Sequence, residues 1–163
     1  MEIGKIIPVG EENQQEIGDR RAGGIADLPD SHLRLLRGAY TAAMSTVNAS
    51  GSVQLTPVWL MDDGEHLLFN TARGRHKARN LAARPHVSFL IVDPKDPFVW
   101  VSLQGQVVRV VDEDDVESGH LATETINRAA ALYLGVDVYP NRDDRGEVRR
   151  LYYIRPDRVV VMG

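Results

Sequence analysis

The stretch that decides the fold runs from residue 69 to residue 110 and reads FNTARGRHKARNLAARPHVSFLIVDPKDPFVWVSLQGQVVRV. It begins at the end of an apolar run and passes through a basic segment into the most β-rich part of the chain. Ala78, Leu81 and Ala82 recur at spacings of three and four, which predicts a short helix starting near Gly74. Pro85 disfavours helical backbone in the residue before it, so the helix should end there.

Strand patterns lie on both sides of this helix. HVSFLIVD and FVWVSLQGQVVRVV follow it, while AYTAAMSTV, VQLTPVWLM and HLLFNT precede it, separated by the turn sequences NASGS and DDGE. Such runs with turn residues between them are typical of a β-meander. Pro57 cannot donate to a ladder, so its strand should be an edge strand or bulged. The closing YYIRPDRVVV predicts two short strands around Arg155, Pro156 and Asp157.

Two further helices are predicted. One is HLRLLRGA, with Asp30 or Ser31 as its cap and Gly38 as its stop. The other spans residues 112–135, with acidic residues in its first turn. Six or seven antiparallel strands with these helices inserted predict a mainly β fold, a β-barrel with peripheral helices.

Few large apolar residues occur at positions 1–29, so we expect a flexible N-terminal arm there and one folded domain at 30–163. Residues 136–150 are polar and predict a mobile loop.

Composition excludes several classes of function. The net charge of −4 argues against a general nucleic-acid binder, and zero cysteines exclude disulfides and thiolate metal sites. The histidines lack metal-ligand spacing, and no Rossmann or P-loop glycine motif is present. No signal sequence or membrane-spanning run is found, so we expect a cytoplasmic protein without membrane or nucleic-acid partners.

The basic segment is the strongest functional signal. Arg73, Arg75, Lys77 and Arg79 alternate where a strand ends and a helix begins. The first turn of a helix has unpaired backbone N–H groups, and together with basic side chains these can hold a phosphate. A surface helix with solvated bases is the alternative, and the residues alone leave both open.

The elements of this stretch follow a specific order: a strand, Asn-Thr, a basic helix, Asn-Leu, a proline, VSFLI, a turn and an aromatic strand that ends in Gln-Gly. This order resembles that of the split β-barrels related to pyridoxamine 5′-phosphate oxidase, which bind flavins or deazaflavins. The resemblance is strongest over residues 39–110 and is closest to the branch that uses the deazaflavin coenzyme F420. It implies an FMN-binding type of split β-barrel and a homodimer with the cofactor cleft between subunits.

The resemblance also implies cofactor-binding residues. Lys77 would hold the cofactor phosphate with Arg75, and Phe98 and Trp100 would reach it from the other subunit. For the tryptophans the alternative is core packing, and Asn80 would bind the phosphate or satisfy backbone. The implied cofactor-binding residues are Thr56, Pro57, Val58, Trp59, Asn70, Thr71, Arg75, Lys77, Phe98 and Trp100.

The implied function is an F420-dependent oxidoreductase that transfers a hydride between the reduced cofactor and an unsaturated small organic substrate. Arg73 and Arg79 would suit the anionic tail of F420. Two alternatives are an FMN-dependent oxidoreductase of the same fold and a non-catalytic, dimeric module that binds flavin or haem. No catalytic acid or base is nominated, and the tryptophan of true pyridoxamine-phosphate oxidases is missing from LYYIRPDRVVVMG.

Overall fold

A computed structural model of the protein describes residues 15–16, 25–143 and 146–163. Three α-helices and one 3-10 helix accompany eight strands in the described ranges. The helices are η1 (Ile25–Asp27), α1 (Asp30–Arg37), α2 (His76–Ala83) and α3 (His120–Leu134). The strands are β1 (Gln15–Glu16), β2 (Ala42–Val47), β3 (Val53–Val58), β4 (Met61–Asp62), β5 (Leu67–Ala72), β6 (His86–Asp93), β7 (Asp96–Asp112) and β8 (Arg149–Met162).

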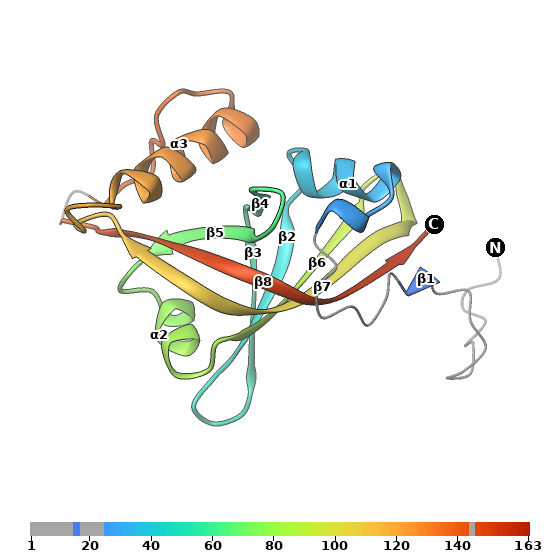
Figure 1. The fold of residues 1–163 in the computed structure, drawn as a ribbon, viewed down its shortest axis with the longest axis horizontal. Helices are drawn as coiled ribbons and strands as arrows, with labels where there is room; N and C mark the ends of the chain where they lie inside the picture. The colour runs from blue at the N-terminus through green and yellow to red at the C-terminus, as the bar shows by residue number, and fades with distance from the viewer. Residues whose placement is uncertain (1–14, 17–24, 144–145) are drawn as a thin grey trace.

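The strands form one antiparallel sheet in the order β3-β2-β6-β7-β8-β5-β4, with β1 paired to β8. β3 and β4 lie at opposite ends of this order, yet only Trp59 and Leu60 separate them in the chain. The sheet therefore curls round until its two ends approach each other (Figure 1). The predicted mainly β split barrel is confirmed, and Pro57 lies on an edge strand, as predicted.

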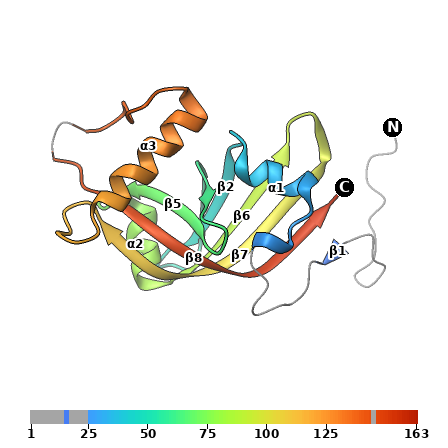
Figure 2. The same cartoon turned by 45° about the horizontal axis from the view of Figure 1, so that its top comes forward.

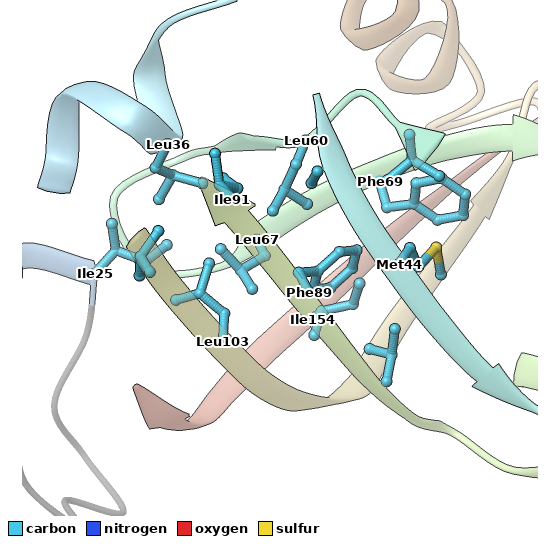
Figure 3. Close-up of a cluster of buried hydrophobic side chains, with 14 of the residues drawn as sticks. Ile25, Leu36, Met44, Leu60, Leu67, Phe69, Phe89, Ile91, Leu103 and Ile154 are labelled. Atoms are coloured by element: carbon cyan, nitrogen blue, oxygen red, sulfur yellow. The ribbon is translucent and has the colours of Figure 1, made fainter. Parts of the chain in front are cut away.

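Two apolar clusters hold the layers together. The larger one fills the concave side of the sheet and includes Met44, Leu67, Phe69 and Phe89 (Figure 3). The smaller one lies on the other side of β5 and β8, beneath α3, and includes Leu68. Because side chains alternate along a strand, β5 contributes to both clusters. α3 covers β5 and β8, whereas α1 lies apart from it and contacts β4, β6 and β7 (Figure 2).

Helix α2 departs from its prediction in two details. It begins at His76 rather than near Gly74, and Ala82 is exposed, while Ala78 and Leu81 are buried as predicted. The third buried residue is Asn80, which is 4% exposed.

The Asn80 amide joins α2 to the β2–β3 hairpin. Its Nδ2 donates to Thr46 Oγ1 at 3.0 Å and to Asn48 Oδ1 at 2.9 Å. Of the two roles left open for this residue, the structure thus shows a structural one, although its partners are side chains rather than backbone groups.

The predicted helix over residues 112–135 begins later than expected. Strand β7 continues to Asp112, and the acidic residues that follow form turns. The Asp115 carboxylate accepts hydrogen bonds from the backbone N–H groups of Glu117 and Ser118, an arrangement that competes with helix. The helix therefore starts at His120, and it ends at Gly135 as predicted, with a left-handed φ of 70°.

At α1 the predicted stop at Gly38 is confirmed, but the cap is not. Pro29 occupies the N-cap position and Asp30 is already helical, with no capping hydrogen bond from a side chain. An acidic residue in the first turn still complements the helix dipole.

The C-terminal segment forms one long strand instead of two short ones. Gln104 pairs with Arg158 and Gly105 with Pro156, so Asp157 is left over as a bulge. The bulge absorbs the proline, which has no N–H for the ladder, and β8 continues through it.

The N-terminal boundary falls earlier than position 30 as judged by packing, because Ile25 and Leu28 are buried in the larger core cluster. The expected flexible arm lies mostly outside the described residues, and for residues 1–14 and 17–24 it stays a prediction. Within the described ranges, no helix combines the length and apolar character needed to cross a membrane.

The bulge in β8 generates a stability prediction for Gly105→Ala. A Cβ at Gly105 would lie 2.4 Å from the Arg155 carbonyl oxygen and 2.9 Å from Ile154 Cγ2. We expect the substitution to lower the free energy of unfolding by about 1–3 kcal/mol, the usual cost of overpacking. Gly74→Ala is the matched control, since its Cβ would meet nothing within 4 Å. Equal urea midpoints for the two variants would contradict the close approach.

Candidate functional site

A cavity of about 360 Å³ opens beside β5, which falls within the range of small-molecule sites. β4 pairs with β5 only at Leu67 and Leu68. The next residues of β5, Phe69 to Ala72, therefore have no strand partner on that side among the described residues. The end of β3 supplies the facing wall. The cavity is lined by Thr41, Pro57, Val58, Trp59, Phe69, Asn70, Thr71, Arg75, Lys77, Ile126, Tyr139, Asn141 and Arg149.

The alternation of β5 divides the cavity into two sides. Phe69 belongs to the concave core with α2, whereas Asn70 turns to α3, where its Nδ2 donates to the Ala122 carbonyl at 2.8 Å. One side of the cavity therefore lies against the start of α2, and the other lies between β5, β8 and α3. We call these the α2 side and the α3 side.

On the α2 side, two cations lie together without a carboxylate. Among the described residues, neither Arg75 nor Lys77 forms an ion pair within 4.0 Å. The Lys77 ammonium lies 5.9 Å from the centre of the Phe69 ring. Burial lowers the pKa of Lys77, and the charge of Arg75 lowers it further. Both effects disfavour the charged lysine, and a bound anion would offset them.

The start of α2 adds backbone donors to this side. Arg75 is the N-cap residue, and no side chain caps the helix. The first N–H groups of a helix have no partner within it and carry its positive dipole end. Phosphate is the anion that such a combination of N–H groups and two cations fits best.

On the α3 side, the central residue is Arg149, which is 5% exposed. Its Nη1 lies 2.7 Å from Glu147 Oε1, and its Nε donates to Asn70 Oδ1 at 2.9 Å. The guanidinium carbon lies 5.0 Å from the centre of the Tyr139 ring. The Asn70 amide, which the resemblance implies as a cofactor ligand, thus already hydrogen-bonds to Arg149 and to the Ala122 carbonyl.

Aromatic rings form the wall next to Arg149. Trp59 stacks on Tyr133 with ring centres 5.0 Å apart, and Tyr139 meets Trp59 edge-on at 5.8 Å. The Tyr133 hydroxyl donates to the Tyr40 carbonyl at 2.9 Å. This hydrogen bond ties α3 to the segment before β2 and fixes the position of the Trp59 ring.

The segment that carries Tyr139 and Asn141 is held by Glu113. Burial acts to raise the pKa of Glu113, but hydrogen bonds from Arg142, from the Thr123 hydroxyl and from the Arg149 backbone N–H outweigh it and lower the pKa to about 2. Glu113 therefore joins α3, β8 and the 136–143 segment at the cavity. We call this group of contacts the Glu113 clamp.

The structure brings most of the implied site residues together. Pro57, Val58 and Trp59 line one wall of the cavity, and the residues of β5 and α2 line the other. Thr56 precedes the lining residues on β3. Phe98, 66% exposed, and Trp100 lie on β7 and do not line the cavity of their own chain. Their contact with a cofactor held by a second subunit stays a prediction.

Sequence reasoning missed several lining residues. Tyr139, Asn141 and Arg149 all lie in the segment interpreted as a mobile loop, although Arg149 is the first residue of β8. Four arginines occur in that polar stretch, and nothing in the sequence indicates that one of them is buried. Arg73 has its own partners, with Nη1 lying 3.0 Å from Asp114 Oδ2 and 3.4 Å from Asp112 Oδ2. Arg79 donates to the Gly74 carbonyl at 2.9 Å.

The fold and the cavity define a split-barrel protein with two cations at a strand end that have no carboxylate partner among the described residues. Residues 28–161 match the family described as pyridoxamine 5′-phosphate oxidase. The chain belongs to this family. Comparison with curated proteins finds no match.

Solved structures share the fold at low sequence identity. A structure titled F420 reductase is 23% identical with a TM-score of 0.68, covering 81% of this chain and 98% of that one. The haem storage protein HutZ from Vibrio cholerae is 16% identical with a TM-score of 0.55, covering 77% and 87%. A putative pyridoxamine 5′-phosphate oxidase from Listeria innocua is 17% identical with a TM-score of 0.52, covering 75% and 87%.

The Glu113 clamp generates a prediction about acid stability. The pKa of Glu113 in the folded protein lies below its ordinary value of 4.5, so the stabilisation is fully present above pH 4.5 and is lost as the pH falls towards about 2. Glu113→Gln should lower the free energy of unfolding at pH 7, and the difference from the unmodified protein should shrink between pH 4.5 and 2. Urea unfolding at several pH values measures this difference.

A difference between the two proteins that stays constant with pH would show that Glu113 is not held as an ionised carboxylate. Glu117→Gln is the control, because among the described residues the Glu117 side chain takes part in no ion pair or hydrogen bond.

Proposed function

We propose that the protein is an oxidoreductase that uses a phosphorylated flavin-type cofactor, with F420 as the preferred one. The observation that carries the proposal is the pair Arg75 and Lys77, which lies at the start of α2 without a carboxylate partner and lines a cavity that continues along the open edge of β5. Two cations with unpaired backbone N–H groups form a phosphate site, and the remaining cavity leads away from it.

The walls of that cavity fit a flat heteroaromatic ring. β3 pairs only with β2, and Phe69 to Ala72 of β5 lack a partner on the facing side, so both strands turn backbone groups towards the space between them. The polar edge of an isoalloxazine-type ring, with its carbonyl and N–H groups, can pair with such backbone. Pro57 removes one N–H from the β3 edge and leaves the neighbouring carbonyl groups as acceptors.

The protein's part in the reaction is to bind, orient and exclude water. The cofactor would supply hydride transfer to or from an unsaturated small molecule. Arg75 and Lys77 would hold its phosphate, and Pro57, Val58 and Trp59 would lie along its ring. The lining residues include no histidine and no carboxylate, so the proton in a reduction would come from water that reaches the cavity.

A second hollow supports F420 over FMN. It lies beyond Arg75 and has a volume of about 570 Å³. Arg75 lines both spaces, so a chain that extends past the phosphate has room to continue there. FMN ends at its phosphate, whereas F420 carries a lactyl and polyglutamyl tail. Arg73 also lines this hollow, but it already pairs with Asp114. Asp143 and Glu147 line the hollow as well, so its space, and not its charge, favours the longer cofactor.

The absence of a cavity histidine or carboxylate favours a second candidate, a module that binds flavin without turnover. Haem is the less suitable ligand, because no lining residue among those described is a histidine that could serve as its axial ligand. Reducing the bound cofactor and mixing it with a panel of quinones and enones separates the two functions. Reoxidation by at least one acceptor supports the enzyme, and none supports storage.

A homodimer completes this proposal. Val53, Leu55 and Phe98 are 63%, 67% and 66% exposed on the outer part of the sheet, and Leu90 is 40% exposed. Leu55 pairs with Ser45, and Leu90 with Ala43, so neighbouring strands carry these apolar side chains on one uncovered face. An apolar face of this kind suits a second copy of the chain.

The phosphate site generates a prediction for Lys77→Ala. Loss of a charged hydrogen-bond donor should weaken binding of both FMN and F420 by roughly 1.5–3 kcal/mol. Titration followed by absorbance or fluorescence measures both affinities. Arg79→Ala is the matched control on the same helix, because Arg79 is exposed, does not line the cavity and donates to the Gly74 carbonyl.

Unchanged affinity in Lys77→Ala would refute the phosphate site. In the unmodified protein, tighter binding of FMN than of F420 would refute the cofactor preference while leaving the site intact.

The apolar face generates a prediction for Leu55→Glu. A charge at the centre of a dimer interface is costly to bury, so this variant should be monomeric in sedimentation velocity experiments at concentrations where the unmodified protein is dimeric. Val116→Glu is the control, since Val116 is fully exposed in the turn before α3 and lies away from this face. A Leu55→Glu dimer as stable as that of the unmodified protein would rule out this interface.

A further inference from the structure

The α3 side of the cavity contains a buried ion pair that a phosphate on the α2 side does not use. The side chains of Arg149 and Glu147 are 6% and 7% exposed, and their closest nitrogen and oxygen atoms lie 2.7 Å apart. Asn70 and Tyr139 hold the guanidinium on its other sides. Burying two charges is costly, and the guanidinium is fixed in one orientation towards the cavity.

Part of this guanidinium remains available to a ligand. It has five N–H donors, and the contacts with Glu147 and Asn70 engage Nη1 and Nε. Among the described residues, Nη2 donates no hydrogen bond, and Tyr152 Oη is the only fully buried polar side-chain atom without a partner. Nη2 is therefore not fully buried, and Arg149 is one of the residues that line the cavity.

The charge balance of the pair selects the kind of acceptor. Glu147 neutralises Arg149 at short range, so a second carboxylate near Nη2 would gain little attraction and would be repelled by Glu147. A neutral carbonyl oxygen accepts the same hydrogen bond without that repulsion. The α3 side thus differs from the α2 side, where Arg75 and Lys77 have no negative neighbour and suit an anion.

The surrounding surface suits a flat, conjugated molecule. Trp59 and Tyr139 present aromatic rings, and Ile126 adds an apolar side chain. Aromatic walls favour planar ligands through stacking. Because these two rings already touch each other edge-on, a ligand would lie against the surface they form rather than between them. Such a molecule would place a polar end at Arg149 and extend towards the space beside Pro57 and Val58, where we propose that the cofactor ring binds.

We propose that the α3 side is the substrate compartment and that Arg149 is a specificity-determining residue for neutral, conjugated carbonyl compounds. The chemistry of this inference rests on the proposed function. A bound reduced cofactor would supply the hydride for the β-carbon and would itself be oxidised, while the electron pair of the C=C bond would move towards the carbonyl oxygen. Arg149 would stabilise the negative charge on that oxygen, and water would supply the proton to the α-carbon.

The test uses three probes of similar shape: methyl cinnamate, the cinnamate anion and propenylbenzene, which has no carbonyl. Calorimetric titration of the full chain should give tighter binding of methyl cinnamate than of cinnamate. Arg149→Met should weaken methyl cinnamate binding by about tenfold or more, the effect of losing a hydrogen bond to a charged group. It should leave propenylbenzene binding unchanged.

Glu147→Gln should shift the binding preference from the neutral ester towards the cinnamate anion. It leaves the positive charge of Arg149 without its neighbour, so cinnamate should bind more tightly than it does to the unmodified protein. The double variant R149M/E147Q removes both charges and covers the case in which the single Arg149→Met variant does not fold. Like the single variant, it should show weaker binding of methyl cinnamate.

Unchanged methyl cinnamate affinity in Arg149→Met, or in the double variant if the single one is unfolded, would overturn the inference. Cofactor titration of the same variants separates the two proposals. A loss of FMN and F420 affinity with unchanged ester binding would assign Arg149 to the cofactor. Ester binding that depends on Arg149 in a protein that binds neither cofactor would sustain the compartment and reject the proposed function.

Discussion

Within the part of the chain that the structure describes, the last four residues of β5 have a strand on one side only, and this constraint organises the rest of the site. β4 covers just the first two residues of β5, after which its edge is open. An open edge must satisfy its backbone groups with water or with a ligand. The same four residues alternate between the concave core and α3, so a single strand presents different chemistry to the two sides of one cavity.

Charge is distributed unequally around that strand. Arg75 and Lys77 stand without a carboxylate, and burial lowers the pKa of Lys77. On the other side, Arg149 is balanced by Glu147, and Glu113 is held ionised by Arg142 and by neighbouring hydrogen bonds. Lys77 is half-buried and Arg75 is exposed, and the absence of a carboxylate beside them among the described residues is what supports the proposed anion site. The paired ones build the wall opposite and fix its shape.

The elements that depend only on the residues of one segment were predicted correctly from local sequence patterns. The strand, the short basic helix and the edge position of Pro57 were all predictable, because spacing and the missing proline N–H act within a few residues. The acidic residues at 112–118 were misleading, since acids favour a helix start and an Asx turn alike, and the ladder of β7 with β8 decided between them. The burial of Arg149 depends on Asn70, Glu147 and Tyr139 arriving from distant or irregular segments, and no local pattern encodes that meeting.

Asn80 determines the width of the cavity without touching anything inside it. Its amide joins α2, which carries Lys77, to Thr46 and Asn48 of the β2–β3 hairpin, which carries the opposite wall. The two walls are therefore tied directly to each other, whereas the 136–143 segment is attached separately through Glu113 and Asn127. Substitutions in that segment can thus change which molecules the cavity accepts while the gap proposed for the cofactor ring keeps its dimensions. A redesign of the cavity for new ligands would begin at Tyr139 and Asn141 and would leave Asn80 alone.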